Sequence, residues 1–446
     1  MFGVYENRDA KSGRIINLGV VVLKAQHPTG DALAYIEGGP GVPAVPDAAP
    51  VADGDDPIVA KVRDRYDVLF VDSRGMGTSN PTNCNISPYN DMATYFLQIW
   101  PDKILSACYQ RYAKTSNPSQ YNTNNAVDDL DDVRAALGYH KLILYGGSYA
   151  SFFSFVYLRR HGDHVKSALL EAIGAPGFMP LPGAPDGAQT ALDDLTSKCS
   201  RDPRCAKQFP HFREHFYAVV ARFEEKPLSV TVRNPKTKQL QSVLLSREVL
   251  VDRIRENLYF PETAAYLPFI IERAYQADYV PLGRLVNLWS QFMANGQDAG
   301  TNLAYRCADF DPFISEQELQ VAAAHSFTGD LRVRAERNAC RTWKVDPMPA
   351  NFNDPVVSGV PVLLLNGSDD PATPPKYAMG AVRYLANGKL VLVRGAGHGV
   401  DTPCTTRLMI EFLRAGSAKN IDANACTGAF KTPRFATSMA KWQNFE

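Results

Sequence analysis

The sequence carries no excess of charge of either sign, since lysine plus arginine and aspartate plus glutamate each number 47. Proteins that bind nucleic acid or anionic membranes carry a basic excess, so the balance argues against both classes. No run of eighteen apolar residues is present, which argues against a membrane span. Internal repeats are also missing. A 446-residue chain with 45% hydrophobic residues is typical of a large globular enzyme.

The cysteines lack the Cys-x-x-Cys spacing of zinc sites. Their even number and wide spread favour disulfides, as in exported proteins. Buried thiols are the alternative. The simplest pairing joins neighbours along the chain: Cys84 with Cys108, Cys199 with Cys205, Cys307 with Cys340, and Cys404 with Cys426. Charged residues interrupt positions 1–24, which are therefore not a signal peptide, and we expect a secreted or periplasmic protein whose leader is absent from this chain.

A serine lies between a strand pattern and a helical pattern. The apolar run at 142–145 is typical of a strand buried on both faces, and glycines end it just before Ser148. Apolar residues then recur at helical spacing from 152 to 158. This order is that of a nucleophile elbow, where small residues two before and two after the serine allow a strained turn. Here they are Gly146 and Ala150. An ordinary strand-to-helix turn is the alternative.

Two loops near the carboxyl end offer an acid and a histidine. Asp369 and Asp370 follow one buried-strand pattern, and His398 follows the next. The carboxyl ends of parallel strands share one edge of a sheet, so these loops are expected to converge with Ser148. The order Ser, Asp, His is that of α/β-hydrolases. In such a triad His398 takes the serine proton, and the acid, either Asp370 or Asp369, orients the imidazole.

A glycine-rich turn follows an early strand pattern at 32–36, in the sequence Glu37-Gly38-Gly39-Pro40-Gly41. We expect the N–H groups of Gly39 and Tyr149 to form the oxyanion hole, because Pro40 has no N–H. A simple surface turn is the alternative. Residues 15–23 are predicted as one further strand. In the loop after the strand predicted at 67–71, we expect Asp72 and Arg74 to brace the loop through an ion pair and backbone hydrogen bonds.

Helical periodicity dominates from residue 174 to about 350, between two regions of strand pattern. The predicted fold class is α/β, with a mostly parallel sheet built from residues 1–173 and 353–446. A helical cap domain, 174–352, is inserted between the sheet strands. Residues 80–125 are predicted as a loop-rich excursion held by the first cysteine pair.

Five motifs in order resemble the secreted tripeptidyl aminopeptidase and proline iminopeptidase group of α/β-hydrolases, over about residues 15–426. They are Glu37-Gly-Gly-Pro-Gly, Asp72-x-Arg-Gly-x-Gly-x-Ser, Gly146-Gly-Ser-Tyr, Gly367-x-x-Asp-Pro-x-Thr-Pro and Gly397-His398. In this group the triad acid directly precedes the proline, which indicates Asp370 over Asp369. Ala150 departs from the usual glycine, and Leu170-Glu171-Ala172 departs from the usual Leu-Asp-Gly. Both departures lie beside the predicted site, so substrate choice is open.

The resemblance implies a serine aminopeptidase that releases amino-terminal residues or tripeptides from short peptides, with no metal or organic cofactor. Such an enzyme binds a free ammonium with carboxylates near the cap, and the candidates here are Glu171 and Asp309, with Glu262 and Glu37 weaker. The expected partner is a short peptide or small-molecule substrate, and a monomer is favoured. An esterase or amidase for small molecules and a catalytically silent binding protein on the same scaffold are the alternatives.

Overall fold

The computed structural model describes residues 1–84, 86 and 92–445. Its centre is a seven-stranded sheet with the order β11-β10-β7-β6-β4-β5-β3. In chain order the strands are β3 (Val20–Leu23), β4 (Ala32–Tyr35), β5 (Asp67–Val71), β6 (Leu142–Gly147), β7 (Val165–Glu171), β10 (Val362–Gly367) and β11 (Gly388–Val393). Only β3 is antiparallel to its neighbour, β5, within this sheet. The predicted α/β fold class is confirmed.

The strand predicted at 15–23 was wrong in extent, because the chain forms two strands there. β2 (Ile15–Leu18) pairs with β1 (Phe2–Tyr5) in a separate sheet, and β3 starts after Gly19. Gly19 packs against the loop that follows β5: its N–H donates to Ser79 Oγ at 2.8 Å, and a Cβ at this position would lie 1.9 Å from Thr78 Oγ1. This close backbone approach ends one strand and begins the next.

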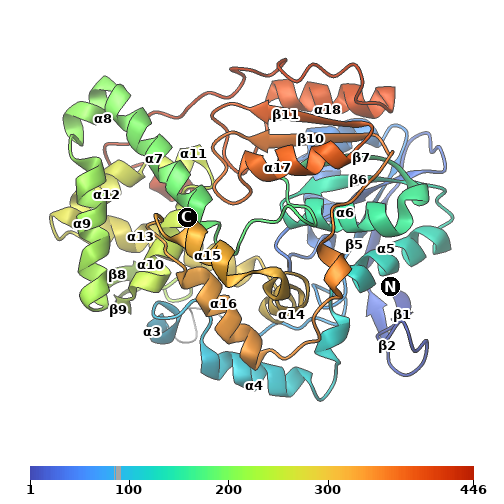
Figure 1. The fold of residues 1–446 in the computed structure, drawn as a ribbon, viewed down its shortest axis with the longest axis horizontal. Coiled ribbons are helices and arrows are strands. Elements are labelled where there is room, and N and C mark those ends of the chain that lie inside the picture. Colours follow the sequence, from blue (N-terminus) through green and yellow to red (C-terminus); the bar gives the residue numbers. More distant parts are fainter. Residues whose placement is uncertain (85, 87–91, 446) are drawn as a thin grey trace.

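Helices cover both faces of the sheet (Figure 1). One face packs against α5 (Thr123–Ala136), α6 (Tyr149–His161) and α17 (Pro375–Ala381), and the other against α1 (Ala48–Asp53), α2 (Pro57–Val62) and α18 (Pro403–Ala415). Successive side chains of a strand alternate between the two cores, so Leu142 and Leu144 lie in the first and Ile143 in the second. This explains why the central strands are apolar throughout.

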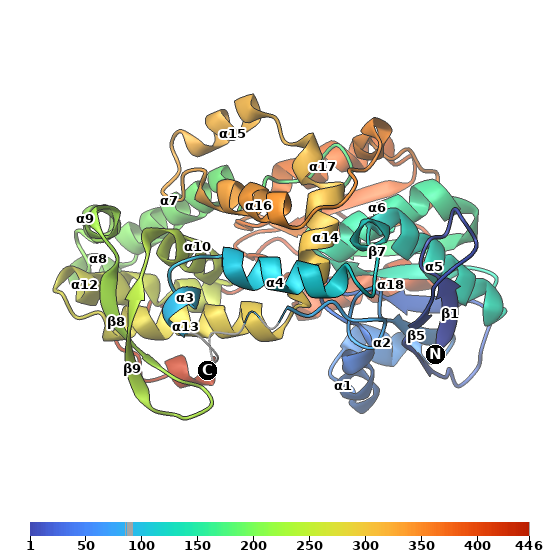
Figure 2. The ribbon, with the colours of Figure 1, turned by 90° about the horizontal axis from the view of Figure 1, so that it is seen from below.

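Between β7 and β10 the chain is mostly helical, as the periodicity predicts. Its helices are α7 (Pro185–Arg201), α8 (Pro203–Gln208), α9 (Phe212–Glu225), α10 (Arg247–Asn257), α11 (Pro261–Ala264), α12 (Leu267–Tyr275), α13 (Val280–Asn295), α14 (Ala299–Asp309), α15 (Glu316–Ala323) and α16 (Leu331–Thr342). A hairpin of β8 (Leu228–Arg233) and β9 (Leu240–Leu245) interrupts them, which the helical prediction missed. Figure 2 shows this hairpin extending away from the sheet.

The excursion at 80–125 contains helices α3 (Met92–Tyr95) and α4 (Asp102–Tyr112), while residues 85 and 87–91 of it lie outside the described residues. The ion pair predicted between Asp72 and Arg74 was wrong. Arg74 is fully buried and binds Asp129 of α5 through two hydrogen bonds of 2.7 and 2.8 Å. The predicted backbone hydrogen bonds are confirmed, because the Asp72 carboxylate accepts the N–H groups of Val45 and Thr78. Arg74 therefore links the loop after β5 to α5, whereas Asp72 binds backbone N–H groups within the same loop and in the segment before α1.

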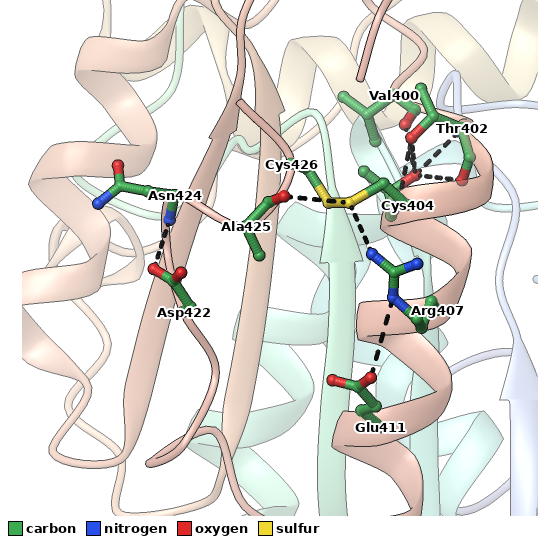
Figure 3. The surroundings of a disulfide bond; sticks show 10 residues. Val400, Thr402, Cys404, Arg407, Glu411, Asp422, Asn424, Ala425 and Cys426 are labelled. Carbon is green, nitrogen blue, oxygen red and sulfur yellow. Dashed lines mark hydrogen bonds and ion pairs between the residues drawn. A yellow bond between two sulfur atoms is a disulfide. The ribbon is translucent and has the colours of Figure 1, made fainter. Parts of the chain in front are cut away.

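Four disulfides join cysteines that are neighbours along the chain: Cys84–Cys108, Cys199–Cys205, Cys307–Cys340 and Cys404–Cys426. The last one ties the start of α18 to the segment that follows this helix (Figure 3). From there the chain crosses to the helices inserted between β7 and β10 (Figure 1), where Trp442 is buried against Tyr266. None of the described helices combines the length and the apolar character that crossing a membrane requires.

Candidate active site

Ser148 occupies the sharp turn between β6 and α6. Its backbone has φ +60° and ψ −125°, a conformation that non-glycine residues rarely adopt. A Cβ at Gly146 would lie 2.3 Å from the Ile36 carbonyl oxygen and 2.7 Å from the Ala150 Cβ. Glycine is therefore required at 146. The alanine methyl at 150 occupies the space beside it, so the departure from glycine at 150 is compatible with the elbow.

His398 and Asp370 lie in hydrogen-bond contact at the ends of β11 and β10. His398 Nδ1 is 2.9 Å from Asp370 Oδ2, and since a carboxylate only accepts, Nδ1 carries the proton. Asp370 also accepts the N–H groups of Ala372 and Thr373 and the Thr373 hydroxyl, the last at 2.6 Å. Burial alone would raise the pKa of Asp370, but His398 and these hydrogen bonds outweigh it and lower the pKa. The carboxylate thus stays ionised.

Asp369, the other acid in this loop, points elsewhere. Its carboxylate contacts Lys198 of α7 and accepts the Ser368 hydroxyl at 2.6 Å. The same loop therefore holds one acid against the histidine and the other against α7. This geometry favours Asp370 as the orienting acid.

The glycine-rich loop after β4 runs alongside Ser148. A Cβ at Gly38 would lie 3.6 Å from the Ser148 Cβ, and Gly39 follows with φ +106°. Tyr149 is the first residue of α6, so its N–H is among the helix donors without an intrahelical partner. The two predicted oxyanion donors therefore belong to segments that flank the serine.

A cavity of about 640 Å3 opens at this edge of the sheet, and both Ser148 and His398 line it. Its most distinctive feature is a set of carboxyl side chains. They are Glu37, Asp47, Asp55, Asp56, Glu171 and Asp401. Among the described residues that line the cavity there is no lysine or arginine. The described lining of the cavity is thus acidic, with no basic side chain to balance it.

Burial raises the pKa of three cavity carboxyls, Glu37, Glu171 and Asp401, and neighbouring carboxylates add to the effect. Burial, with added repulsion from Asp401 and Asp56, raises the pKa of Glu171 to about 8. Burial and the neighbouring Asp47 raise the pKa of Glu37 to about 7. Glu37 and Glu171 therefore both bind protons near neutral pH.

The candidate ammonium-binding acids do not lie in one place. Glu171 lines the cavity with Ser148, as does Glu37, whereas Glu262 is exposed at the start of α11. Asp309 lines a different cavity, of about 520 Å3, between α14, α15 and α17. Its Oδ2 accepts the N–H and hydroxyl of Thr123, and burial raises its pKa to about 7.

Segments inserted between β7 and β10 contact the loops of the site. Tyr259 lies just before α11, and its carbonyl oxygen accepts the backbone N–H of His398 at 2.7 Å. The centre of its ring is 5.1 Å from the centre of the histidine ring. Asn302 of α14 donates from Nδ2 to the Pro40 carbonyl oxygen at 2.6 Å. Thr373, Tyr259 and Asn302 were not among the predicted site residues. Only Thr373 lies within a recognised motif, whereas the other two become neighbours of the site through tertiary packing.

One group of described side chains has the geometry of metal ligands. Asp131, His161 and His164 bring one potential ligand atom each to within 4.8 Å of one another. However, Arg134 binds the Asp131 carboxylate and lies 3.1 Å from His164 Nδ1. The trio is therefore already an ion-paired contact between α5, the last residue of α6 and the turn that follows α6.

Comparisons with known proteins agree with this architecture. The family model described as TAP-like protein matches residues 326–426, a span that contains both Asp370 and His398. Serine protease Hip1 of Mycobacterium tuberculosis is 22% identical over 92% of this chain and 83% of its own length. The tripeptidyl aminopeptidase of Streptomyces lividans is 29% identical over 32% of this chain and 29% of its own length.

Among solved structures, an esterase from Exiguobacterium antarcticum is 13% identical, covers 90% of this chain and 96% of its own, and has a TM-score of 0.38. The strand order and the inserted helices are those of an α/β-hydrolase, and the sequence is similar to tripeptidyl aminopeptidase-like proteins.

Proposed function

We propose that this chain is a serine peptidase that releases residues from the free amino terminus of short peptides through an acyl-enzyme on Ser148. The observation that carries the proposal is the hydrogen bond between Asp370 and His398, because His398 lines the same acidic cavity as Ser148. The relatives named serine protease and tripeptidyl aminopeptidase support the same reaction class. The four disulfides support export from the cytoplasm.

The reaction follows from the residue types. His398 Nε2 takes the hydroxyl proton as Ser148 Oγ attacks the scissile carbonyl carbon, and Asp370 stabilises the imidazolium that forms. The N–H groups of Gly39 and Tyr149 bind the oxyanion, and such a donor is typically worth about a hundredfold in rate or more. His398 then gives its proton to the departing amine. Water, activated by the same histidine, hydrolyses the ester and restores Ser148.

The inserted segment 174–352 acts in this proposal as a cap that limits substrate length. It supplies Tyr259 beside the histidine and Asn302 beside the oxyanion loop, so it lies against the groups that perform the chemistry. A folded protein would have to displace these contacts. Short peptides are therefore the expected substrates.

The test compares initial rates on Ala-Ala-Phe p-nitroanilide, its acetylated twin, alanine p-nitroanilide and p-nitrophenyl butyrate. A free-amine anilide should be hydrolysed at least ten times faster than its acetylated twin, and Ser148→Ala should abolish the activity. Hydrolysis of the butyrate ester alone would replace the peptidase with an esterase. If no substrate is hydrolysed and a fluorophosphonate does not label the chain, the protein is a catalytically silent binding protein.

A further inference from the structure

The helices inserted between β7 and β10 contain a group of charged side chains that bind one another inside the protein. They are Asp252, Arg253, Arg255 and Glu256 of α10, Arg306 of α14, and Arg332 and Glu336 of α16. Arg306 is partly buried and the others are buried. Apolar side chains in place of buried ion pairs often leave stability unchanged or raise it, so stability alone is a weak reason for such a group.

One end of the group lies against the loop that carries His398, which we call the histidine loop. Arg255 donates to the Tyr259 hydroxyl, and its guanidinium lies 5.0 Å from the centre of the Tyr259 ring. The Tyr259 carbonyl oxygen in turn accepts the backbone N–H of His398. The approach is close, since a Cβ at Gly397 would lie 2.1 Å from that oxygen. Arg255 therefore holds the residue against which the histidine loop packs.

The other end of the group acts on the glycine-rich loop after β4. Arg306 Nε donates to Asn302 Oδ1 at 3.0 Å, and Asn302 Nδ2 donates to the Pro40 carbonyl oxygen at 2.6 Å. A side-chain amide accepts through its oxygen and donates through its nitrogen, so the arginine fixes which way the Asn302 amide points. Pro40 follows Gly39, whose N–H is one of the two expected oxyanion donors. Arg306 therefore orients the side chain that holds this loop.

Three side chains join the two ends without a break. Arg306 Nη1 donates to Glu336 at 3.2 Å, and Arg332 Nε donates to the same carboxylate at 2.7 Å. Arg332 Nη1 also donates to Asp252 at 3.0 Å, and Arg255 Nη2 donates to that carboxylate at 3.1 Å. We call these five residues the ion chain. Guanidinium and carboxylate groups are planar and bind in fixed orientations, so the ion chain resists displacement of either loop.

We propose that the ion chain positions the histidine loop and the glycine-rich loop relative to each other on the two sides of Ser148. One positioning residue is Arg255, which acts through Tyr259. The other is Arg306, which acts through Asn302. This inference rests on the proposed serine peptidase activity, in which the base and the oxyanion donors must meet one substrate carbonyl together. A displacement of about 1 Å in such a site can lower the rate on the order of a hundredfold.

Double-mutant cycles test whether each arginine acts through its neighbour. Arg306→Met should lower kcat about tenfold in the wild-type chain, with KM changed less than about twofold, but lower kcat less than about twofold in Asn302→Ala. Arg255→Met should show the same difference between the wild-type chain and Tyr259→Phe. Unchanged kcat in both single arginine variants, or an equal loss in both backgrounds, would overturn the inference, because arginines that only stabilise the helices give such results.

Arg253→Met is the matched control. Arg253 is buried in the same helix, but it donates to Ser290, Asp252 and Glu256 and lies outside the ion chain. The charged group holds four arginines and three acids, so each of the three methionine variants leaves its charges balanced. The control should lower Tm about as much as the other two variants and change kcat less than about twofold. An equal loss of kcat in the control would also overturn the inference.

The rate at which a neutral fluorophosphonate labels Ser148 is a second readout, because it needs the base and the oxyanion donors but no peptide. Tyr259→Phe removes one hydroxyl and no charge, so it reports on the histidine end even if the arginine variants do not fold. We expect it to slow labelling about fivefold, and a wild-type rate would contradict the proposal.

The same readout separates this inference from the proposed function. If the wild-type chain is labelled but hydrolyses no anilide, the peptidase assignment fails, and the labelling rates of the variants still decide whether the ion chain positions the two loops. If the wild-type chain is not labelled at all, both the proposed function and this inference fail.

Discussion

At the scale of single residues, the site depends on how Asp370 is held. The carboxylate accepts two backbone N–H groups and the Thr373 hydroxyl, in addition to His398. Hydrogen bonds to a charged group are typically worth about 1.5–3 kcal/mol. The loop thereby fixes the acid in one orientation before substrate arrives, and the imidazole is oriented in turn.

Thr373→Val should lower kcat about tenfold or more with little change in KM, because the lost hydroxyl leaves one Asp370 oxygen less constrained. Thr373→Ser is the matched control, since it keeps the hydroxyl, and should retain most of the activity. Steady-state kinetics on a free-amine anilide measure both constants. A larger effect of the serine variant than of the valine variant would contradict this role.

The two adjacent acids allow a direct comparison. Asp370→Asn should reduce kcat by about three to four orders of magnitude, since the amide no longer stabilises the imidazolium and the wrong tautomer is favoured. Asp369→Asn loses only a contact to Lys198 and should keep kcat within about threefold. The opposite ranking of the two variants would move the acid of the triad to Asp369.

At the scale of secondary-structure elements, apolar runs predicted the central strands because these strands are buried on both faces. The β8–β9 hairpin was missed because half of its residues face solvent and its residues lie within a long helical region. The partner of Arg74 was missed for another reason. Asp129 lies 55 positions away, and only the packing of α5 against the loop after β5 brings the two together.

Asn302 of helix α14 contacts the glycine-rich loop after β4. Asn302→Ala should therefore lower kcat about tenfold. The variant removes the donor to the Pro40 carbonyl oxygen, so the backbone around Gly39 is less firmly positioned. Gln297→Ala is the control, because Gln297 accepts from the same Asn302 amide. Unchanged kcat in Asn302→Ala would show that the loop is held without α14.

At the scale of the whole molecule, the sequence predicted which segments meet but not what surrounds them. Ser148, Asp370 and His398 were identified because each follows a buried strand, and strand ends of one sheet share an edge. The acidic cavity was not predicted. Its carboxyls come from segments between residues 37 and 401, so no local pattern groups them.

The raised pKa of Glu171 makes stability depend on pH. Its pKa is about 8 in the folded chain against an ordinary value of 4.5, so the folded state holds the extra proton between these values. Its contribution to the free energy of unfolding is present below pH 4.5 and is lost as pH rises towards 8. Glu171→Gln should therefore be more stable than wild type at pH 8, by about 4 kcal/mol.

Thermal unfolding of both proteins at pH 5 and pH 8 measures this effect. We expect Tm of the variant to exceed that of wild type at pH 8 by a few degrees and to differ little at pH 5. A variant that is less stable at both pH values would show that the carboxylate is ionised and paired in the folded chain.

The central claim is that Ser148 is the nucleophile of a working triad, and peptide mapping after reaction with a fluorophosphonate tests it most directly. We predict one phosphonyl group per chain, located on Ser148, with peptidase activity lost in proportion to labelling and with little labelling of His398→Ala. Labelling at another residue, or full peptidase activity in a chain labelled at Ser148, would contradict the account.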